Sequence, residues 1–273
     1  WREFTDPAPE DERIHTSWLS YTAEQRIENF IGVGSVGEPR FYSRISPNIY
    51  VDLPFQVIAY NRHINDKNVL LIPDHEFLDT EFRRSLRNVI SGDIPWAQKV
   101  HQIMWRGQSH SVEGYSYAAV GYEEVLAVHG KTRAHPRRVA VYLSQCRGCF
   151  TPDVSRIMNA SFDNSTTISE MLRSKYQLDL DGMVTAWSGS FWKLFSSSVV
   201  FKPWTHWEQW YSNQLIPFVH YVPLANLSPL EVWKAFEWCE VVNPEQCAAI
   251  ARQSSRLVRG LTYEYAVKEY NIH

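Results

Sequence analysis

Hydrophobic and polar positions along the chain fall into blocks that predict strands and helices in alternation. Short apolar runs bounded by Pro, Gly or polar clusters predict buried strands. These runs occupy residues 48–63 (one or two strands), 68–73, 100–105, 176–180, 196–202 and 218–224. Helix-like segments, two of them preceded by a Ser or Asn cap, cover residues 79–90, 136–145, 228–242 and 243–261. Apolar strands that alternate with helices are typical of an α/β fold with a parallel sheet.

A break in this pattern divides the chain near residue 95. Gly92 and Pro95 interrupt the periodicity within the segment SGDIPWAQ. The 273 residues are enough for two modest domains that each bury a core. We therefore predict two α/β halves.

Composition and charge exclude several classes of protein. Hydrophobic residues make up 44% and charged residues 21%, and no apolar run approaches the roughly 20 residues of a membrane-spanning helix. A net charge of −3 argues against a nucleic-acid partner, although residues 131–138 form a local basic cluster. The 14% aromatic residues favour a carbohydrate or nucleotide ligand, because flat rings stack on sugars and bases. A Trp-rich core explains them as well.

The cysteines and the first residues bear on the compartment. Cys146 and Cys149 have CxxC spacing, but Cys239 and Cys247 are too far apart to complete a zinc motif, so we expect reduced thiols. The chain begins with polar and acidic residues and no signal peptide, which predicts a cytoplasmic protein. Three sequons, which matter only on a secretory pathway, begin at Asn159, Asn164 and Asn226.

A cluster of titratable residues follows the strand predicted at 68–73. Asp74, His75 and Glu76 come directly after this apolar run. In open α/β sheets, ligands bind beyond the carboxyl ends of the strands, which makes Asp74 a candidate site residue. Helix capping is the alternative, because Asp is a preferred N-cap and a helix is predicted just downstream.

Three segments of the second half carry groups that suit a phosphate. Arg106 and Gln108 follow a predicted strand, Arg137 and Arg138 begin a predicted helix, and residues 188–190 form a small-residue loop before another helix. Guanidinium groups make bidentate contacts to phosphate oxygens, and N–H groups at a helix start attract the same ligand. Together these segments predict a diphosphate site.

Four segments, in this order, resemble landmarks of glycosyltransferase family 90, the protein O-glucosyltransferase and capsule-associated family. They are WRG (105–107), PRRVAVYLSQ (136–145), the stretch from KYQLDLDG to WSGSFWKLFSSSVVFK (175–202), and HWEQWYSNQLIPFVHYVPL (206–224). The last is the most specific, since its WYxxxLxPxVHYVP pattern is difficult to reach by chance. The resemblance covers roughly residues 55–260. The short chain looks like the compact members encoded by large algal viruses, which favours a xylosyltransferase.

The resemblance implies a GT-B fold, in which two Rossmann-like domains face a cleft. The expected parts are an N-terminal acceptor and base domain (1–95), a nucleotide-sugar-binding domain (96–260) and a C-terminal helix (261–273) that packs back on the first domain. The implied activity is the inverting transfer of a sugar, xylose before glucose, from a UDP-sugar to a glycan hydroxyl, with no metal and no cofactor. A viral member would act in the host cytoplasm.

The resemblance also implies a donor site. An Arg at the head of the helix after WRG contacts the donor phosphates, and the spacing assigns this role to Arg137, with Arg138 second. The family tends to carry an Arg after WSG, where this chain has Ser190, so that Lys193 or the N–H groups of Ser190 and Phe191 would replace it. The expected donor-site residues are Arg106, Gly107, Gln108, Arg137, Arg138, Ser188, Gly189, Ser190, Phe191, Lys193 and Glu208.

An inverting enzyme needs a base for the acceptor proton, and the family uses an Asp of the N-terminal domain. Asp74 is the first choice and Asp52 the second, since Asp52 stands close to Pro54 and could simply cap a turn. A carbohydrate-binding protein that has lost its chemistry is the alternative function, motivated by Ser190. A nucleotide-binding oxidoreductase is disfavoured because the glycine-rich segment 32–37 lacks a preceding strand.

Overall fold

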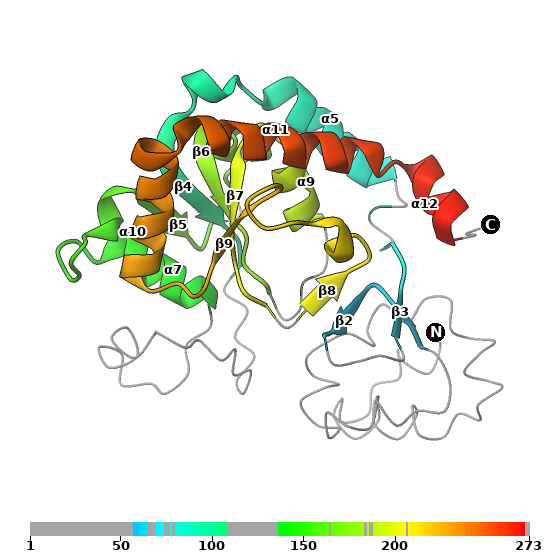
Figure 1. Ribbon diagram of the computed structural model, residues 1–273, viewed down its shortest axis with the longest axis horizontal. Coiled ribbons are helices and arrows are strands. Elements are labelled where there is room, and N and C mark those ends of the chain that lie inside the picture. Colours follow the sequence, from blue (N-terminus) through cyan, green and yellow to red (C-terminus); the bar gives the residue numbers. More distant parts are fainter. Residues whose placement is uncertain are drawn as a thin grey trace.

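A five-stranded parallel sheet forms the centre of the protein (Figure 1). The computed structural model describes residues 57–64, 69–73, 77, 80–108, 136–163, 165–182, 185, 188–205 and 207–270. The strands, in spatial order, are β5 (Met158–Ser161), β4 (Val100–Arg106), β6 (Ser174–Leu178), β7 (Val199–Pro203) and β9 (Val222–Leu224). Every neighbouring pair in this sheet is parallel, so the predicted α/β fold class is confirmed.

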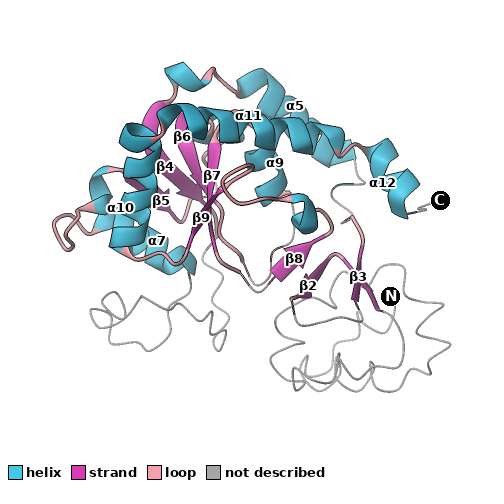
Figure 2. Ribbon diagram, in the orientation of Figure 1, coloured by secondary structure: helices cyan, strands magenta, loops and turns pink. Residues whose placement is uncertain are grey.

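Helices cover both faces of the sheet (Figure 2). Along β4, Ile103 and Trp105 belong to one core cluster, with α7 and α10, and Met104 belongs to the other, with α5 and α9. Consecutive residues of this part of β4 are therefore buried on opposite sides, which explains its apolar run. The α-helices are α5 (Thr80–Gly92), α7 (Pro136–Gln145), α8 (Ile168–Met171), α9 (Gly189–Phe195), α10 (Pro229–Glu237), α11 (Pro244–Gly260) and α12 (Tyr263–Tyr270).

Four short strands lie outside the main sheet. The predicted strand at 68–73 is confirmed as β3 (Val69–Leu71), which pairs in parallel with β1 (Val57–Ala59). β2 (Asn61–His63) pairs antiparallel with β8 (Trp207–Gln209), far along the sequence. This pairing joins the N-terminal segment to the part that carries the large sheet. A second Rossmann-like domain remains a prediction, since the elements described before residue 95 are β1, β2, β3 and α5.

Two local predictions are corrected. The segment 218–224 is not one strand, because Phe218 has a positive φ of 60° in a turn, and only β9 is extended. The His220 ring holds this turn by accepting the Ile216 N–H at 3.0 Å. Ser228 is confirmed as the cap of α10, since its hydroxyl accepts the Glu231 N–H. Asn243 occupies the corresponding position before α11 but makes no side-chain cap bond, and Pro244 begins that helix.

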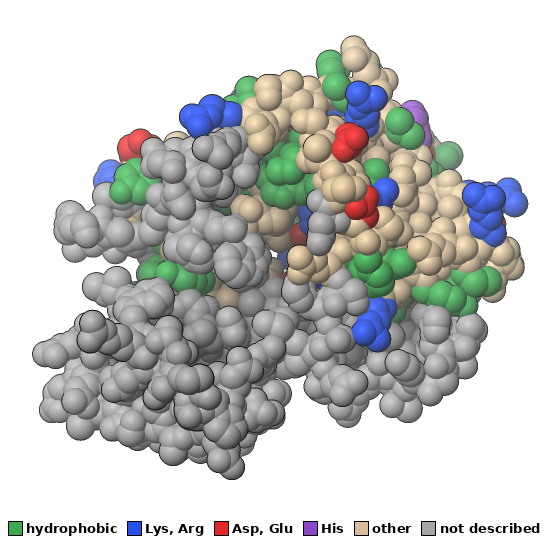
Figure 3. Space-filling model, turned by 180° about the vertical axis from the view of Figure 1, so that it is seen from behind, with side chains coloured by type: hydrophobic (Ala, Val, Ile, Leu, Met, Phe, Trp, Pro, Cys, Tyr) green, Lys and Arg blue, Asp and Glu red, His purple; other side chains and the backbone are tan. Residues whose placement is uncertain are grey.

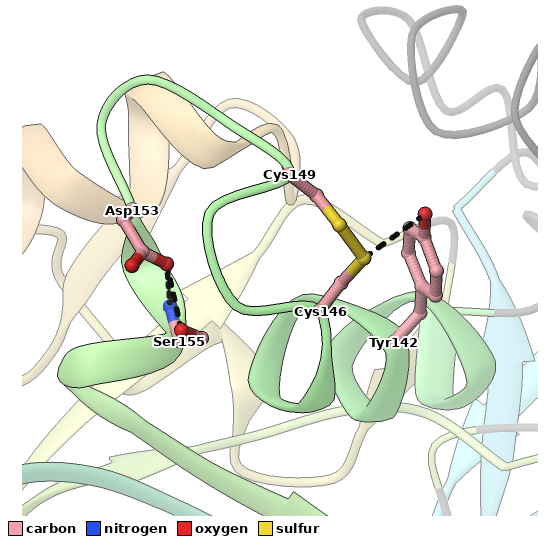
Figure 4. The surroundings of a disulfide bond; sticks show 5 residues. All are labelled: Tyr142, Cys146, Cys149, Asp153 and Ser155. Atoms are coloured by element: carbon pink, nitrogen blue, oxygen red, sulfur yellow. Dashed lines mark hydrogen bonds between the residues drawn. A yellow bond between two sulfur atoms is a disulfide. The ribbon is translucent and has the colours of Figure 1, made fainter.

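The prediction of reduced thiols is wrong, because all four cysteines form disulfides. Cys146 follows α7, and a turn through Gly148, with a φ of 70°, brings Cys149 back so that the two Cα atoms are 5.5 Å apart (Figure 4). Cys239 and Cys247 are buried and have Cα atoms 5.4 Å apart. Disulfides persist mainly in oxidising compartments, so the cysteines count against the expected cytoplasmic location.

The second disulfide joins two helical segments across a change of direction. Cys239 lies in a π-helical turn, η5 (Trp238–Val242), and Cys247 lies in the first turns of α11. Three short 3₁₀ turns complete the described elements: η2 (Trp96–Gln98), η3 (Val154–Arg156) and η4 (Ser212–Gln214). Within the described residues, no helix combines the length and the apolar character needed to cross a bilayer.

Removal of the buried disulfide should lower stability measurably. Cys239→Ala/Cys247→Ala is expected to lose about 2–3 kcal/mol of unfolding free energy, because the unfolded chain is no longer cross-linked over its separation of 8 residues. Urea unfolding with and without a reductant measures the effect. Reductant should shift the wild-type midpoint much more than that of the double variant, and equal shifts would contradict a stabilising role for this bond.

Candidate functional site

Four parallel strands end at the same edge of the main sheet and carry polar residues just beyond their ends. β4 ends at Arg106, β6 at Leu178, β7 at Pro203 and β9 at Leu224. The carboxyl edge of such a sheet is where α/β proteins bind ligands. The segment after β6, together with α7, α9 and the end of β7, forms a charged cluster, defined here as Arg137, Asp179, Asp181, Lys193 and Lys202.

Asp179 holds this cluster together. Its carboxylate is 5% exposed and accepts hydrogen bonds from Lys193 Nζ on Oδ1 at 3.0 Å and from Lys202 Nζ on Oδ2 at 2.7 Å. The Ser190 hydroxyl donates to the same carboxylate, 2.8 Å from Oδ2. Burial on its own would raise the pKa of Asp179, but Lys202 and Lys193 outweigh it and hold the pKa well below its usual range. Asp179 is therefore ionised and fastens α9 to β7.

Asp181 stands two residues further on and differs in its surroundings. Its carboxylate accepts a hydrogen bond from the Thr205 hydroxyl and another from Thr185. Burial raises the pKa of Asp181, and Asp179 adds to this effect, although Lys202 partly offsets it. Protonation of Asp181 is thus easier than that of an ordinary Asp.

The two lysines also differ. Burial lowers the pKa of Lys193, although its ion pair with Asp179 opposes that effect. For Lys202, burial acts in the same direction, but attraction to Asp179 and Asp181 outweighs it and the pKa is raised. Lys202 therefore carries the more persistent charge.

Arg137 is oriented by backbone groups of two different loops. It follows Pro136 at the start of α7, where Pro is favoured. Its Nε donates to the Asp181 carbonyl at 2.9 Å, and its Nη1 donates to the Gln108 carbonyl at 3.0 Å. Its Cζ lies 5.7 Å from the centre of the Trp105 ring. The guanidinium group is therefore held at the carboxyl edge of the sheet.

Glycine at position 182 leaves the space that Arg137 occupies. A Cβ at Gly182 would stand 2.7 Å from Arg137 Nη2, well inside van der Waals contact. The guanidinium group would have to move, whereas the backbone would not. Gly182 is thus part of the support of Arg137.

Arg106 has a mainly structural environment. Its Nη1 donates to the carbonyls of Trp105 and Asn159 at 2.8 and 2.7 Å, and its Nη2 donates to Asn159 Oδ1 at 2.7 Å. Its Nε donates to the Thr166 hydroxyl at 3.3 Å. Four of its five N–H donors are thus used to join β4 to β5 and to the following turn. The Asn159 sequon lies in this network.

Some of the other expected donor-site residues lie in the charged cluster, and the rest do not. Ser190 and Lys193 lie in the charged cluster, and Gln108 contributes its carbonyl to Arg137, whereas Arg138 is exposed on α7 without a hydrogen bond or ion pair to the described residues. Glu208 lies on β8 and accepts from Arg62 Nε at 2.9 Å. No interaction within the described part of the chain joins Glu208 to the cluster. The remaining four are Gly107 beside the Trp105 ring, Ser188 before α9, Gly189 at the start of α9, and Phe191 buried in α9.

The two candidate bases, Asp74 and Asp52, lie outside the described residues. The described residues closest to Asp74 in the sequence are Pro73 and Phe77. Pro73 is buried, and Phe77 packs against Phe191 of α9 and against Trp210. The structure therefore leaves the choice between the two carboxylates open. Among the described residues, no group of three or more His, Cys, Asp or Glu side chains is arranged to hold a metal ion.

Sequence reasoning missed Asp179, Asp181 and Lys202. The signal was present, because Asp179 and Asp181 stand at the carboxyl end of the apolar run at 176–180 much as Asp74 follows the strand at 68–73. Lys202 likewise comes at the end of an apolar strand. The rule that ligands bind beyond the carboxyl ends of strands applies to all three residues.

The geometry gives a site for an anion. Two lysines and an arginine converge where the backbone turns away from the sheet, and guanidinium and ammonium groups are the usual protein partners of phosphate. A buried environment strengthens such contacts because water does not screen them. The cluster can bind a phosphate-bearing ligand.

Comparison with known proteins agrees with this chemistry. The model of glycosyl transferase family 90 matches residues 80–273, which is more than half of the chain and includes the whole charged cluster. Over 87 residues the chain is 34% identical to "Uncharacterized protein 035R" of Invertebrate iridescent virus 3, a match that covers 31% of this chain and 8% of that protein. The chain thus spans only a small part of that relative. By the family match, this chain belongs to glycosyl transferase family 90.

Proposed function

We propose that the chain transfers a sugar, with inversion, from a UDP-sugar to a glycan hydroxyl. Membership of family 90 supports glycosyl transfer. The observation that carries the proposal is the charged cluster at the carboxyl edge of the sheet, since a nucleotide-sugar presents a diphosphate and the cluster presents Arg137 and two lysines. A GT-B arrangement, with the acceptor bound by the N-terminal part, is included in the proposal.

The transfer needs stabilisation of the departing diphosphate. The acceptor oxygen attacks the anomeric carbon, the bond from that carbon to the phosphate oxygen breaks, and its electron pair leaves with UDP. Positive groups aimed at the leaving oxygens lower the barrier, because negative charge develops there. Arg137 is suited to this role because Asp181, Gln108 and Gly182 fix its position before the ligand arrives.

The acceptor hydroxyl must lose its proton as the new bond forms. A carboxylate on the face opposite to the leaving group serves this purpose in an inverting transfer. We propose Asp74 as the base, with Asp52 as the second choice. The proposed activity needs neither metal nor cofactor.

Xylose is the favoured sugar and glucose the next, on the resemblance to compact algal-virus members. A catalytically weak carbohydrate-binding protein is the alternative, since Ser190 has a hydroxyl that is committed to Asp179 where an arginine was expected. Nucleic acid is not among the proposed partners. On the described part of the face in Figure 3, Lys and Arg side chains stand apart, with Asp and Glu between some of them, and form no continuous basic patch.

The first test is a panel of UDP-sugars assayed for binding, slow hydrolysis and transfer. We expect UDP-xylose to bind and to be hydrolysed, UDP-glucose more weakly, and EDTA to change neither, because the phosphate partners are side-chain cations. Calorimetry measures binding, and product analysis measures hydrolysis and transfer. Loss of activity with EDTA and its recovery with manganese would contradict metal-independent transfer, and tight binding without any turnover would favour the carbohydrate-binding alternative.

The second test uses the packing of Arg137. Gly182→Ala should fold almost normally but displace the guanidinium group, and so should weaken UDP binding by about 1.5–3 kcal/mol, as for a lost hydrogen bond to a charged group. Arg137→Ala should give a similar loss. Gly260→Ala is the control, since a Cβ there meets nothing within 4 Å. Unchanged UDP affinity in both site variants would exclude Arg137 as a phosphate ligand.

The third test concerns the base. Asp74→Asn preserves size and capping capacity but removes the proton acceptor, so transfer should fall by about 10²–10⁴-fold while UDP affinity and melting temperature stay close to wild type. Steady-state kinetics measures transfer, calorimetry measures UDP affinity, and thermal unfolding gives the melting temperature. If Asp74→Asn stays fully active and Asp52→Asn does not, the base is Asp52.

A further inference from the structure

The charged cluster contains more positive than negative groups. It has three cationic side chains, Arg137, Lys193 and Lys202, and two carboxylates, Asp179 and Asp181. The formal sum is +1 when both carboxylates are ionised and +2 when Asp181 is protonated. Among these five side chains positive charge exceeds negative charge, which favours the approach of an anion.

Lys202 is the member best placed to meet that anion. It is the fourth residue of β7, at the carboxyl edge, and its side chain is 17% exposed, against 10% for Lys193. The hydrogen bonds of its ammonium group to the described residues are limited to one, to Asp179 Oδ2. An ammonium group has three N–H donors, so two remain for a ligand.

The groups around Lys202 keep it charged and in place. Asp179 and Asp181 attract it, and the Tyr221 hydroxyl lies close enough to interact electrostatically. Lys193 approaches the other oxygen of Asp179 and so prevents that carboxylate from neutralising Lys202 alone. Asp179 therefore fixes the position of Lys202 without cancelling the charge of the cluster.

We propose that Lys202 is a direct ligand of the donor diphosphate and acts together with Arg137. This inference rests on the proposed function and adds to it a residue that approaches the diphosphate from β7, whereas Arg137 approaches from α7. The ligand class is a nucleoside diphosphate or its sugar ester. A nucleoside without phosphates gains nothing from Lys202, and this difference separates a ligand role from a structural one.

The test compares the affinities for UDP and uridine by calorimetry in the whole chain. Lys202→Met should weaken UDP binding roughly 10- to 100-fold, as for a hydrogen bond to a charged group, and leave uridine affinity within a few-fold of wild type. Lys202→Arg should retain most of the preference for UDP. A Lys202→Met protein that keeps the wild-type ratio of the two affinities would overturn the proposal.

A control is available in another lysine that pairs with an Asp. Lys99 forms an ion pair with Asp93 and its side chain is 0% exposed, against 17% for Lys202, but it precedes β4 and so lies at the amino edge of the sheet. Lys99→Met should lose stability in the same way while keeping the wild-type preference for UDP over uridine. If it lost that preference too, the effect of Lys202→Met would be a general consequence of destabilisation and the ligand role would fail.

A measurement on the wild-type protein covers the case in which Lys202→Met does not fold. Amine labelling followed by mass spectrometry should show that saturating UDP protects Lys202 and that uridine does not, whereas Lys99 should respond to neither. Equal labelling of Lys202 with UDP and with uridine would overturn the proposal. A wild-type chain that binds UDP no better than uridine would instead contradict the proposed function itself.

Discussion

The buried carboxylate of Asp179 is the interaction on which the carboxyl edge of the sheet depends. It receives hydrogen bonds from Ser190 and Lys193 of α9 and from Lys202 of β7, so one group fixes the distance between a helix and a strand. Removing one partner from such a buried pair typically costs 3–5 kcal/mol, because the remaining charge is left without compensation. The Asp179 carboxylate therefore anchors α9 to the carboxyl end of β7.

Hydrophobic periodicity was enough to predict the fold class and most elements. The apolar runs at 100–105 and 196–202 are buried on both faces, as in a parallel sheet, and the Pro136 and Ser228 signals mark true helix starts. Hydrophobic periodicity failed where a tertiary contact determines the backbone conformation. The segment 218–224 is as apolar as a strand, but the His220 ring accepts the Ile216 N–H and closes a turn that no periodicity reports. Register and strand order are likewise non-local properties.

The candidate site was predicted only in part for a similar reason. Arg137 was expected from the resemblance to family 90 and from its place at the start of a predicted helix, and the structure places it beside Gly182 and the Asp181 carbonyl. The partners of Asp179 come from residues 190, 193 and 202, whose approach depends on how α9 packs against the sheet. The disulfides were missed because spacing alone does not say that a turn brings Cys146 and Cys149, or η5 and α11, together.

The two edges of the same sheet show why charge balance, more than the number of charges, points to a ligand. At the amino edge, Lys99 is paired with Asp93, and Lys175 faces Glu240, which also receives the Tyr176 hydroxyl. Those buried lysines each have a carboxylate and need nothing further. At the carboxyl edge three cations share two carboxylates, one of which has a raised pKa. The diphosphate of the proposed nucleotide-sugar donor has the charge that would balance these five side chains.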